Sequence, residues 1–156
     1  MSTLVSMQVK KTITIDACKE RVWYTLLDHQ SYREGTSVFA GGSHVDTDWQ
    51  SGSTAMFKDA DGNGLISRII EHIPNGVIVV EHRGVLVDGA EDYVSEEARV
   101  WHGLKERYTV TDTDGVTVLA IMLDVPVREG EWMSHRWDEA LQKLKHMAEQ
   151  HSMTNA

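Results

Sequence analysis

Strand-like and helix-like patterns occupy separate parts of this chain. Residues 38–125 hold a succession of short segments rich in β-branched and aromatic residues, and turn residues separate these segments. A single apolar stripe with helical spacing follows over residues 130–150. Strands that are grouped together, with helices kept apart from them, are typical of an α+β fold with an antiparallel sheet.

Period-two alternation marks the expected strands. In the first of them Val9, Ile13 and Ile15 alternate with polar residues. The second contains Gly41-Gly42, which predicts a bulge or a sharp bend. The predicted strands cover residues 8–16, 38–49, 53–59, 65–73, 77–87, 101–111 and 116–125, and the polar residues 88–99 predict a loop.

Helical spacing appears at both ends of this series. Asp16 as N-cap, with Glu20 in the first turn, predicts a short helix over residues 18–28. Residues 29–37 predict a second short helix or a turn. The long C-terminal helix has an apolar stripe that comprises Met133, Trp137, Ala140, Leu141, Leu144, Met147 and Ala148.

Length and charge restrict the function classes. The chain has 156 residues, which predicts one domain (1–156, core about 8–150). A net charge of −9 argues against nucleic acid and anionic membranes as partners. The lone Cys18 excludes an internal disulfide and favours a cytoplasmic location. Residues 1–7 predict no signal peptide, and no apolar run approaches the roughly 20 residues of a membrane helix.

Four segments, in this order and spacing, resemble a known family. They are Ile15-Asp16-Ala17 followed by Val22-Trp23, the W-x-x-G turn Trp49-Gln50-Ser51-Gly52, the strand Val79-Val80-Glu81-His82-Arg83-Gly84, and the closing helix Trp137 to Leu144. The resemblance is to the START-like or SRPBCC superfamily, which includes the birch pollen allergen. Within it, the chain looks most like bacterial homologues of the activator of the ninety-kilodalton heat-shock chaperone ATPase. Members with chaperone activity carry a further N-terminal domain, to which no segment here corresponds.

The resemblance implies the helix-grip fold, a curved antiparallel sheet of six or seven strands around a long C-terminal helix, with two short helices after the first strand. The gap between sheet and helix would then suit a lipid-like or aromatic ligand. We therefore expect binding of a hydrophobic small molecule by a monomer or weak dimer. The alternatives are a chaperone-associated or other protein-interaction domain, and a small enzyme of the cyclase or hydrolase type.

Two ionisable residues fall on apolar strand faces. His82 shares a face with Ile78 and Val80, and Glu106 lies between Leu104 and Tyr108. A carboxylate in such a place must be paired, or its pKa must rise. If both residues face one cavity, three roles are open, namely structural pairing, orientation of the polar end of a ligand, and proton transfer.

Tryptophans add to the candidate site. Trp23 and Trp137 fit the core faces of helices, whereas Trp49, Trp101 and Trp132 correspond to positions near the cavity mouth of a helix-grip fold. Met56, Met122, Met133 and Met147 are long enough to fill the cavity. The candidate cavity residues are His82, Glu106, Tyr108, Trp49, Trp101, Met133, Trp137 and Leu141.

The remaining motifs favour plain structural roles. Asp59, Asp61 and Asn63 imitate the start of a calcium loop, but Ile70 stands where the bidentate glutamate should be, so we expect a hairpin turn. The eight histidines form no H-E-x-x-H pair and no Cys/His cluster, which predicts no metal. Phosphate-cradling and dinucleotide-binding glycine motifs and G-x-S-x-G are absent from the sequence, so we expect no cofactor and assign no catalytic residue.

Overall fold

The computed structural model describes residues 6–154, with side chains for residues 6–150. The expectation for residues 1–7 therefore falls mostly outside the described part. The strands are β1 (Ser6–Ile15), β2 (His44–Asp46), β3 (Thr54–Lys58), β4 (Gly64–Ile73), β5 (Val77–Val87), β6 (Ala90–Asp92), β7 (Lys105–Thr113) and β8 (Val116–Pro126). The helices are α1 (Lys19–Leu27), α2 (His29–Gly35), α3 (Glu96–Trp101), a 3-10 turn η1 (Val127–Glu129) and α4 (Gly130–Thr154).

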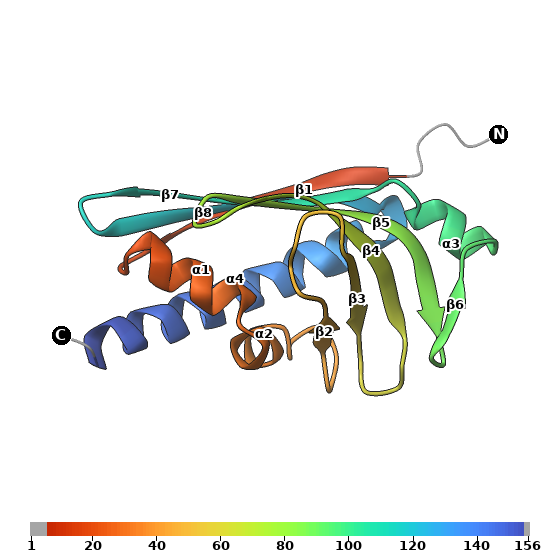
Figure 1. The fold of residues 1–156 in the computed structure, drawn as a ribbon, viewed down its shortest axis with the longest axis horizontal. Coiled ribbons are helices and arrows are strands. Elements are labelled where there is room, and N and C mark those ends of the chain that lie inside the picture. Colours follow the sequence, from red (N-terminus) through yellow and green to blue (C-terminus); the bar gives the residue numbers. More distant parts are fainter. Residues whose placement is uncertain (1–5, 155–156) are drawn as a thin grey trace.

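The strands form one antiparallel sheet in the order β1-β8-β7-β5-β4-β3-β2, with β6 paired to β5. In Figure 1 strands β3, β4 and β5 bend away from the plane of β1, β7 and β8, so the sheet curves around the helices. Register shifts occur in β4 between Ile66 and Ser67 and between Ile69 and Glu71. Such bulges increase local bending and re-aim side chains.

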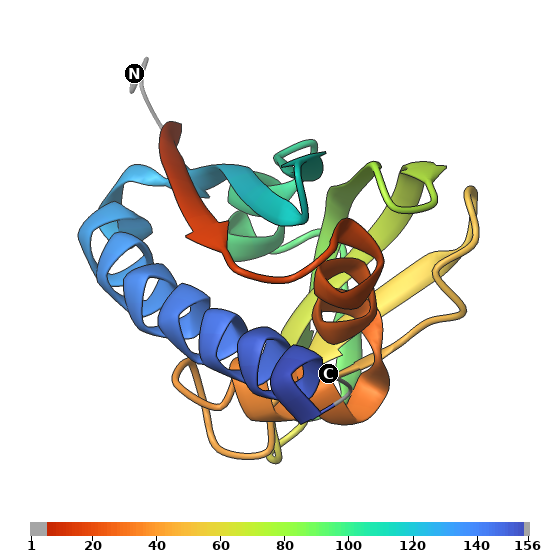
Figure 2. The same ribbon diagram turned by 90° about the vertical axis from the view of Figure 1, so that its left-hand side faces the viewer.

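Helix α4 lies under the concave face of the sheet and runs beside β1 (Figure 2). Its apolar stripe is buried, with Leu141 3% exposed and Ala148 0% exposed. Polar contacts fix its outer edge, since Lys145 donates to the Thr14 carbonyl at 2.8 Å and Lys11 pairs with Asp138 at 2.9 Å. The core forms where this stripe meets the inner strand faces and helix α1. This arrangement confirms the α+β class and the helix-grip fold.

Some element boundaries differ from the sequence prediction. Residues 38–49 were predicted as one strand, but β2 covers only His44–Asp46, because the Gly41-Gly42 pair lies in a turn. Residues 88–99 were predicted as a loop but contain β6 and the start of α3, and Trp101 ends α3 instead of starting a strand. Cys18, not Asp16, is the N-cap of α1, and the Asp16 backbone N–H donates to Glu149.

The described residues contain no helix that is both long and apolar enough to cross a membrane.

Candidate ligand-binding site

Two hollows lie between the sheet and the helices. The inner one is an apolar cavity of about 40 Å³ bounded by α1, α2, α4 and the sheet. The outer one is an open cleft of about 370 Å³. The walls of both include Tyr32, Thr36, Phe57, Tyr108 and Trp137. The cleft and the inner cavity therefore adjoin and share part of their walls.

The two hollows differ in what they can hold. Small-molecule sites usually measure about 300–1,000 Å³, a range that includes the cleft. The inner cavity has room for no more than a few water molecules. Met147 lines this cavity and Met133 lines the cleft, whereas Met56 and Met122 border other hollows, on the opposite strand faces. A ring compound therefore fits the cleft as it stands, and the inner cavity only after Met147 or a neighbour moves.

A row of polar side chains crosses three neighbouring strands beneath the cleft. Ser67 of β4 is directly opposite His82 of β5, and the backbone pairs Glu106 of β7 with Val80 of β5. His82 Nδ1 is 2.7 Å from Ser67 Oγ, and its Nε2 is 2.9 Å from Glu106 Oε2. Tyr108 donates its hydroxyl proton to Glu106 Oε1. Both oxygens of Glu106 are therefore hydrogen-bonded.

This row determines the charge at the floor of the cleft. Burial raises the pKa of Glu106, but the hydrogen bond and charge of His82 and the hydrogen bond of Tyr108 outweigh it and hold the pKa below its ordinary value. Burial and the nearby Glu106 charge raise the pKa of Tyr108 and of Tyr32. At neutral pH the floor therefore carries an ionised carboxylate and two protonated phenols.

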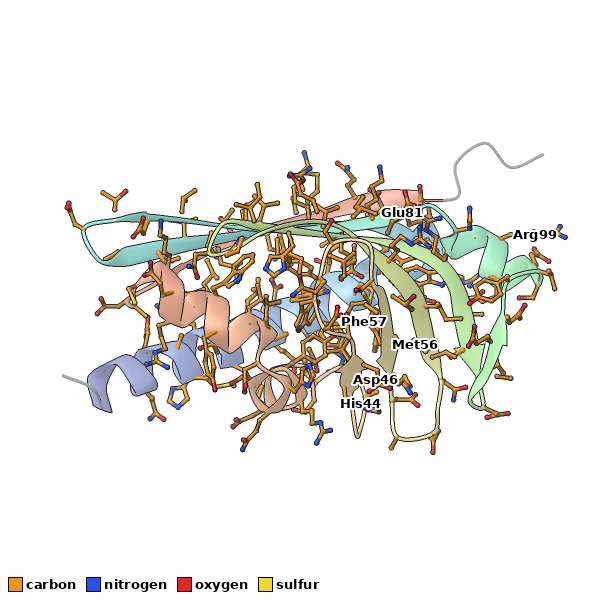
Figure 3. The ribbon with its side chains drawn as sticks, in the orientation of Figure 1. His44, Asp46, Met56, Phe57, Glu81 and Arg99 are labelled. Carbon is orange, nitrogen blue, oxygen red and sulfur yellow. The ribbon has the colours of Figure 1, made fainter. Side chains whose placement is uncertain are left out.

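Six of the sixteen residues that line the cleft are aromatic. The Trp137 ring lies 5.2 Å from Phe39 and 5.8 Å from Tyr108, measured between centroids. Trp132 lies 6.1 Å from Phe39 at the outer end of the cleft. Figure 3 shows Phe57 between the sheet and the helices, while Glu81 lies on the outer side of the sheet. The indole N–H of Trp137 is buried and donates no hydrogen bond to any described residue.

Trp49 closes the inner cavity from the side. Its backbone adopts a left-handed conformation with φ of 60°, and its N–H bonds Thr47 Oγ1 at 3.1 Å. Its indole N–H donates to the Leu27 carbonyl at 3.0 Å, which ties the turn after β2 to the end of α1. Trp49 is therefore a wall residue with both backbone and side chain fixed.

The structure divides the eight predicted cavity residues into two groups. Those that line a hollow are Glu106, Tyr108, Trp49, Met133 and Trp137. Three others lie behind the walls. His82 is 0% exposed beneath Glu106, Trp101 packs edge-on against His82 at 5.5 Å, and Leu141 belongs to the core. Their ligand-binding role stays a prediction.

Sequence reasoning missed several wall residues. Tyr32 and Thr36 come from the segment around α2, and Phe39 and Ala40 from the turn that follows. These residues carry no alternating or helical apolar pattern. Two aromatics within eight residues of a mostly polar segment were the available signal.

The predicted hairpin turn between β3 and β4 is confirmed. Asp59 Oδ1 accepts hydrogen bonds from the backbone N–H groups of Asp61 and Asn63, so these side chains organise the turn itself. Among the described residues no group of three or more His, Cys, Asp or Glu side chains is placed to hold a metal ion. The side chain of His151 lies outside the described residues.

The lowered pKa of Glu106 predicts a pH dependence of stability. A carboxyl group whose folded-state pKa is depressed stabilises the protein above its unfolded pKa, about 4.3, and this contribution is lost as the pH falls through the folded value. We expect the free energy of unfolding to fall more steeply below pH 5 in the wild type than in Glu106→Gln. Urea titrations between pH 3 and 6 measure this. A constant difference between the two proteins over that range would contradict the prediction.

Comparison with known proteins identifies the fold. No family model and no curated protein matches the sequence. Among solved structures, protein MLL2253 from Mesorhizobium loti has a TM-score of 0.70 at 14% identity, over 90% of this chain and 95% of that one. The Aha1 dimer from Colwellia psychrerythraea has a TM-score of 0.67 at 17% identity, over 92% and 96% of the two chains.

DynU16, from the dynemicin biosynthetic locus, has a TM-score of 0.66 at 15% identity over 89% of this chain. The present chain spans 46% of the length of DynU16. At these identities the likeness concerns the fold alone, namely the helix-grip architecture described above.

Proposed function

We propose that this chain binds a hydrophobic small molecule in the cleft between the sheet and α4, and that residues 8–150 form the binding domain. The observation that carries the proposal is an open cleft of about 370 Å³, lined by six aromatic residues, that ends on a largely buried, ionised Glu106. An apolar wall with a few placed polar groups is the usual composition of a small-molecule site. Burial of the ligand's apolar area, at roughly 25 cal/mol per Å², would supply most of the affinity.

The electrostatics favour binding over proton-transfer catalysis. A general base or acid works best when its pKa is close to the working pH. The pKa of Glu106 is lowered and that of Tyr108 is raised, so both are displaced away from neutrality. The His82–Glu106–Tyr108 row therefore suits a fixed polar anchor better than a proton shuttle.

A protein-interaction role is the second candidate. It rests on the likeness to the Aha1 dimer and on the proposal that this chain is one of the chaperone-activator homologues. Tyr93 and Val94, next to β6, are 50% and 74% exposed, which gives a partner an apolar contact. The ligand measurement below discriminates between the two roles, because the interaction role needs no occupied cleft.

Filling part of the cleft should weaken binding. Ala40 lines the cleft, so the side chain in Ala40→Phe would occupy the space of the ligand. We expect at least one compound from a panel of fatty acids, sterols and flavonoids to bind the wild type, and Ala40→Phe to weaken that binding roughly tenfold or more. Native mass spectrometry and calorimetric titration measure both effects.

Ala90→Phe is the matched control, since Ala90 is exposed on β6 and lines neither hollow. It should bind like the wild type. A wild-type protein that carries no ligand and binds none of the panel would contradict the proposal. So would equal binding by Ala40→Phe.

A further inference from the structure

Most charged side chains around the cleft already have partners within the protein before any ligand enters. Glu106 is ionised, and its side chain is 13% exposed. Asp59 also lines the cleft, and the cation Lys58 is held by Asp46 at 2.5 Å. His82 lies behind Glu106 with no exposed surface. A ligand carboxylate at the floor would therefore face a fixed negative charge with no free cation beside it among the described residues.

The floor offers hydrogen-bond acceptors to a ligand. An ionised carboxylate only accepts, and the hydroxyl proton of Tyr108 is directed to Glu106. The remaining lone pairs on both groups can accept a hydrogen bond from a ligand. The floor therefore favours a ligand group that donates.

The wall beside it offers one donor. Trp137 is 8% exposed, lines both hollows, and its buried Nε1–H has no partner among the described residues. A buried donor without a partner is destabilising, and an acceptor on a ligand would remove that cost. The ring centroids of Trp137 and Tyr108 lie 5.8 Å apart in the wall of the cleft, so a shift of the indole would bring its buried Nε1–H to a ligand oxygen beside Tyr108.

From these observations we infer that the ligand is an uncharged ring compound with a hydroxyl group, and that the site rejects carboxylates. The ligand hydroxyl donates to the Tyr108–Glu106 pair, and its oxygen accepts from Trp137 Nε1. The ring of the ligand packs against the aromatic residues of the wall. This inference rests on the proposed function and specifies its ligand.

Three probes with the same ring system test it, namely naphthalene, 2-naphthol and 2-naphthoate at pH 7. Calorimetric titration should show 2-naphthol binding roughly tenfold tighter than naphthalene, the effect of one or two hydrogen bonds. The ionised 2-naphthoate should bind more weakly than either.

Two variants assign these differences to named groups. Trp137→Phe keeps a ring but removes the donor, so the preference for 2-naphthol over naphthalene should shrink to about threefold or less. Trp23→Phe is the matched control, because Trp23 is a buried tryptophan that lines neither hollow. Glu106→Gln removes the charge and should bring 2-naphthoate closer to 2-naphthol.

The outcomes separate the two proposals. Equal binding of the three probes, or tightest binding of 2-naphthoate, overturns the hydroxyl inference while the cleft remains a binding site. An unchanged 2-naphthol preference in Trp137→Phe overturns it too. Failure of all three probes to bind the wild type counts against the proposed function as well.

Discussion

Replacing His82 with leucine is expected to lower the free energy of unfolding by about 3 kcal/mol. His82 is 0% exposed and connects Ser67 to Glu106. Leucine would leave the Glu106 carboxylate in a largely buried place with Tyr108 as its one remaining partner in the row. Urea denaturation at pH 7, followed by circular dichroism, measures the loss.

A double variant separates the orphaned charge from the lost packing. In His82→Leu combined with Glu106→Leu, the uncompensated carboxylate is gone, so about 1–2 kcal/mol of the loss should return. If the double variant is no more stable than the single one, the charge does not cause the destabilisation. A loss below about 1 kcal/mol in the single variant would show that the row contributes little to stability.

Gly64→Ala is the second change with a large expected effect, about 2–3 kcal/mol or more. A Cβ at Gly64 would overlap the backbone carbonyl oxygen of Phe57 and lie 3.0 Å from Lys58 Cα on the neighbouring strand. Backbone atoms of a paired strand cannot rotate away, so β3 and β4 must separate locally. Because Phe57 lines both hollows, ligand affinity should fall together with stability.

Gly130→Ala is the control for this change. Its added Cβ would meet the sulfur of Met7, the flexible end of a partly exposed side chain that can rotate aside. Alanine is also the better helix former, so we expect a change below about 1 kcal/mol in either direction. Thermal unfolding of both variants provides the comparison, and similar losses in the two would contradict the backbone-clash explanation.

The alternating strands and the one continuous stripe of the last helix predicted the α+β class, and the resemblance of four segments to a known family implied the helix-grip fold. It did not predict α3, although Ser95 accepts a hydrogen bond from the Ala98 N–H and Glu96 and Glu97 follow in the first turn, a standard start signal. The acidic residues around this signal made the segment resemble a solvated loop. Short helices are held by tertiary contacts, here Ala98 and Trp101 packed against Val85, which no local pattern reveals.

The candidate site was predictable in part. Period-two alternation was sufficient to place His82 and Glu106 on apolar faces, and the structure brings them to 2.9 Å. Their contact also depends on register, since Glu106 lies opposite Val80 in the ladder, not opposite His82. Ser67 joins them through a bulge in β4. Register and bulges are set by long-range pairing, which a single sequence does not display.

The cleft has two unlike sides. The polar groups of its floor, Glu106 and Tyr108, stand on β7, which is paired on both flanks within the sheet. The opposite wall, with Phe39 and Ala40, belongs to a turn segment that a backbone bond from Ala60 to Gly41 ties to the β3–β4 hairpin. Selectivity for the polar group therefore resides in the stiff side. The turn segment determines which ring sizes the cleft accepts. Related proteins could therefore bind larger or smaller ligands through changes in residues 36–43, with the sheet unchanged.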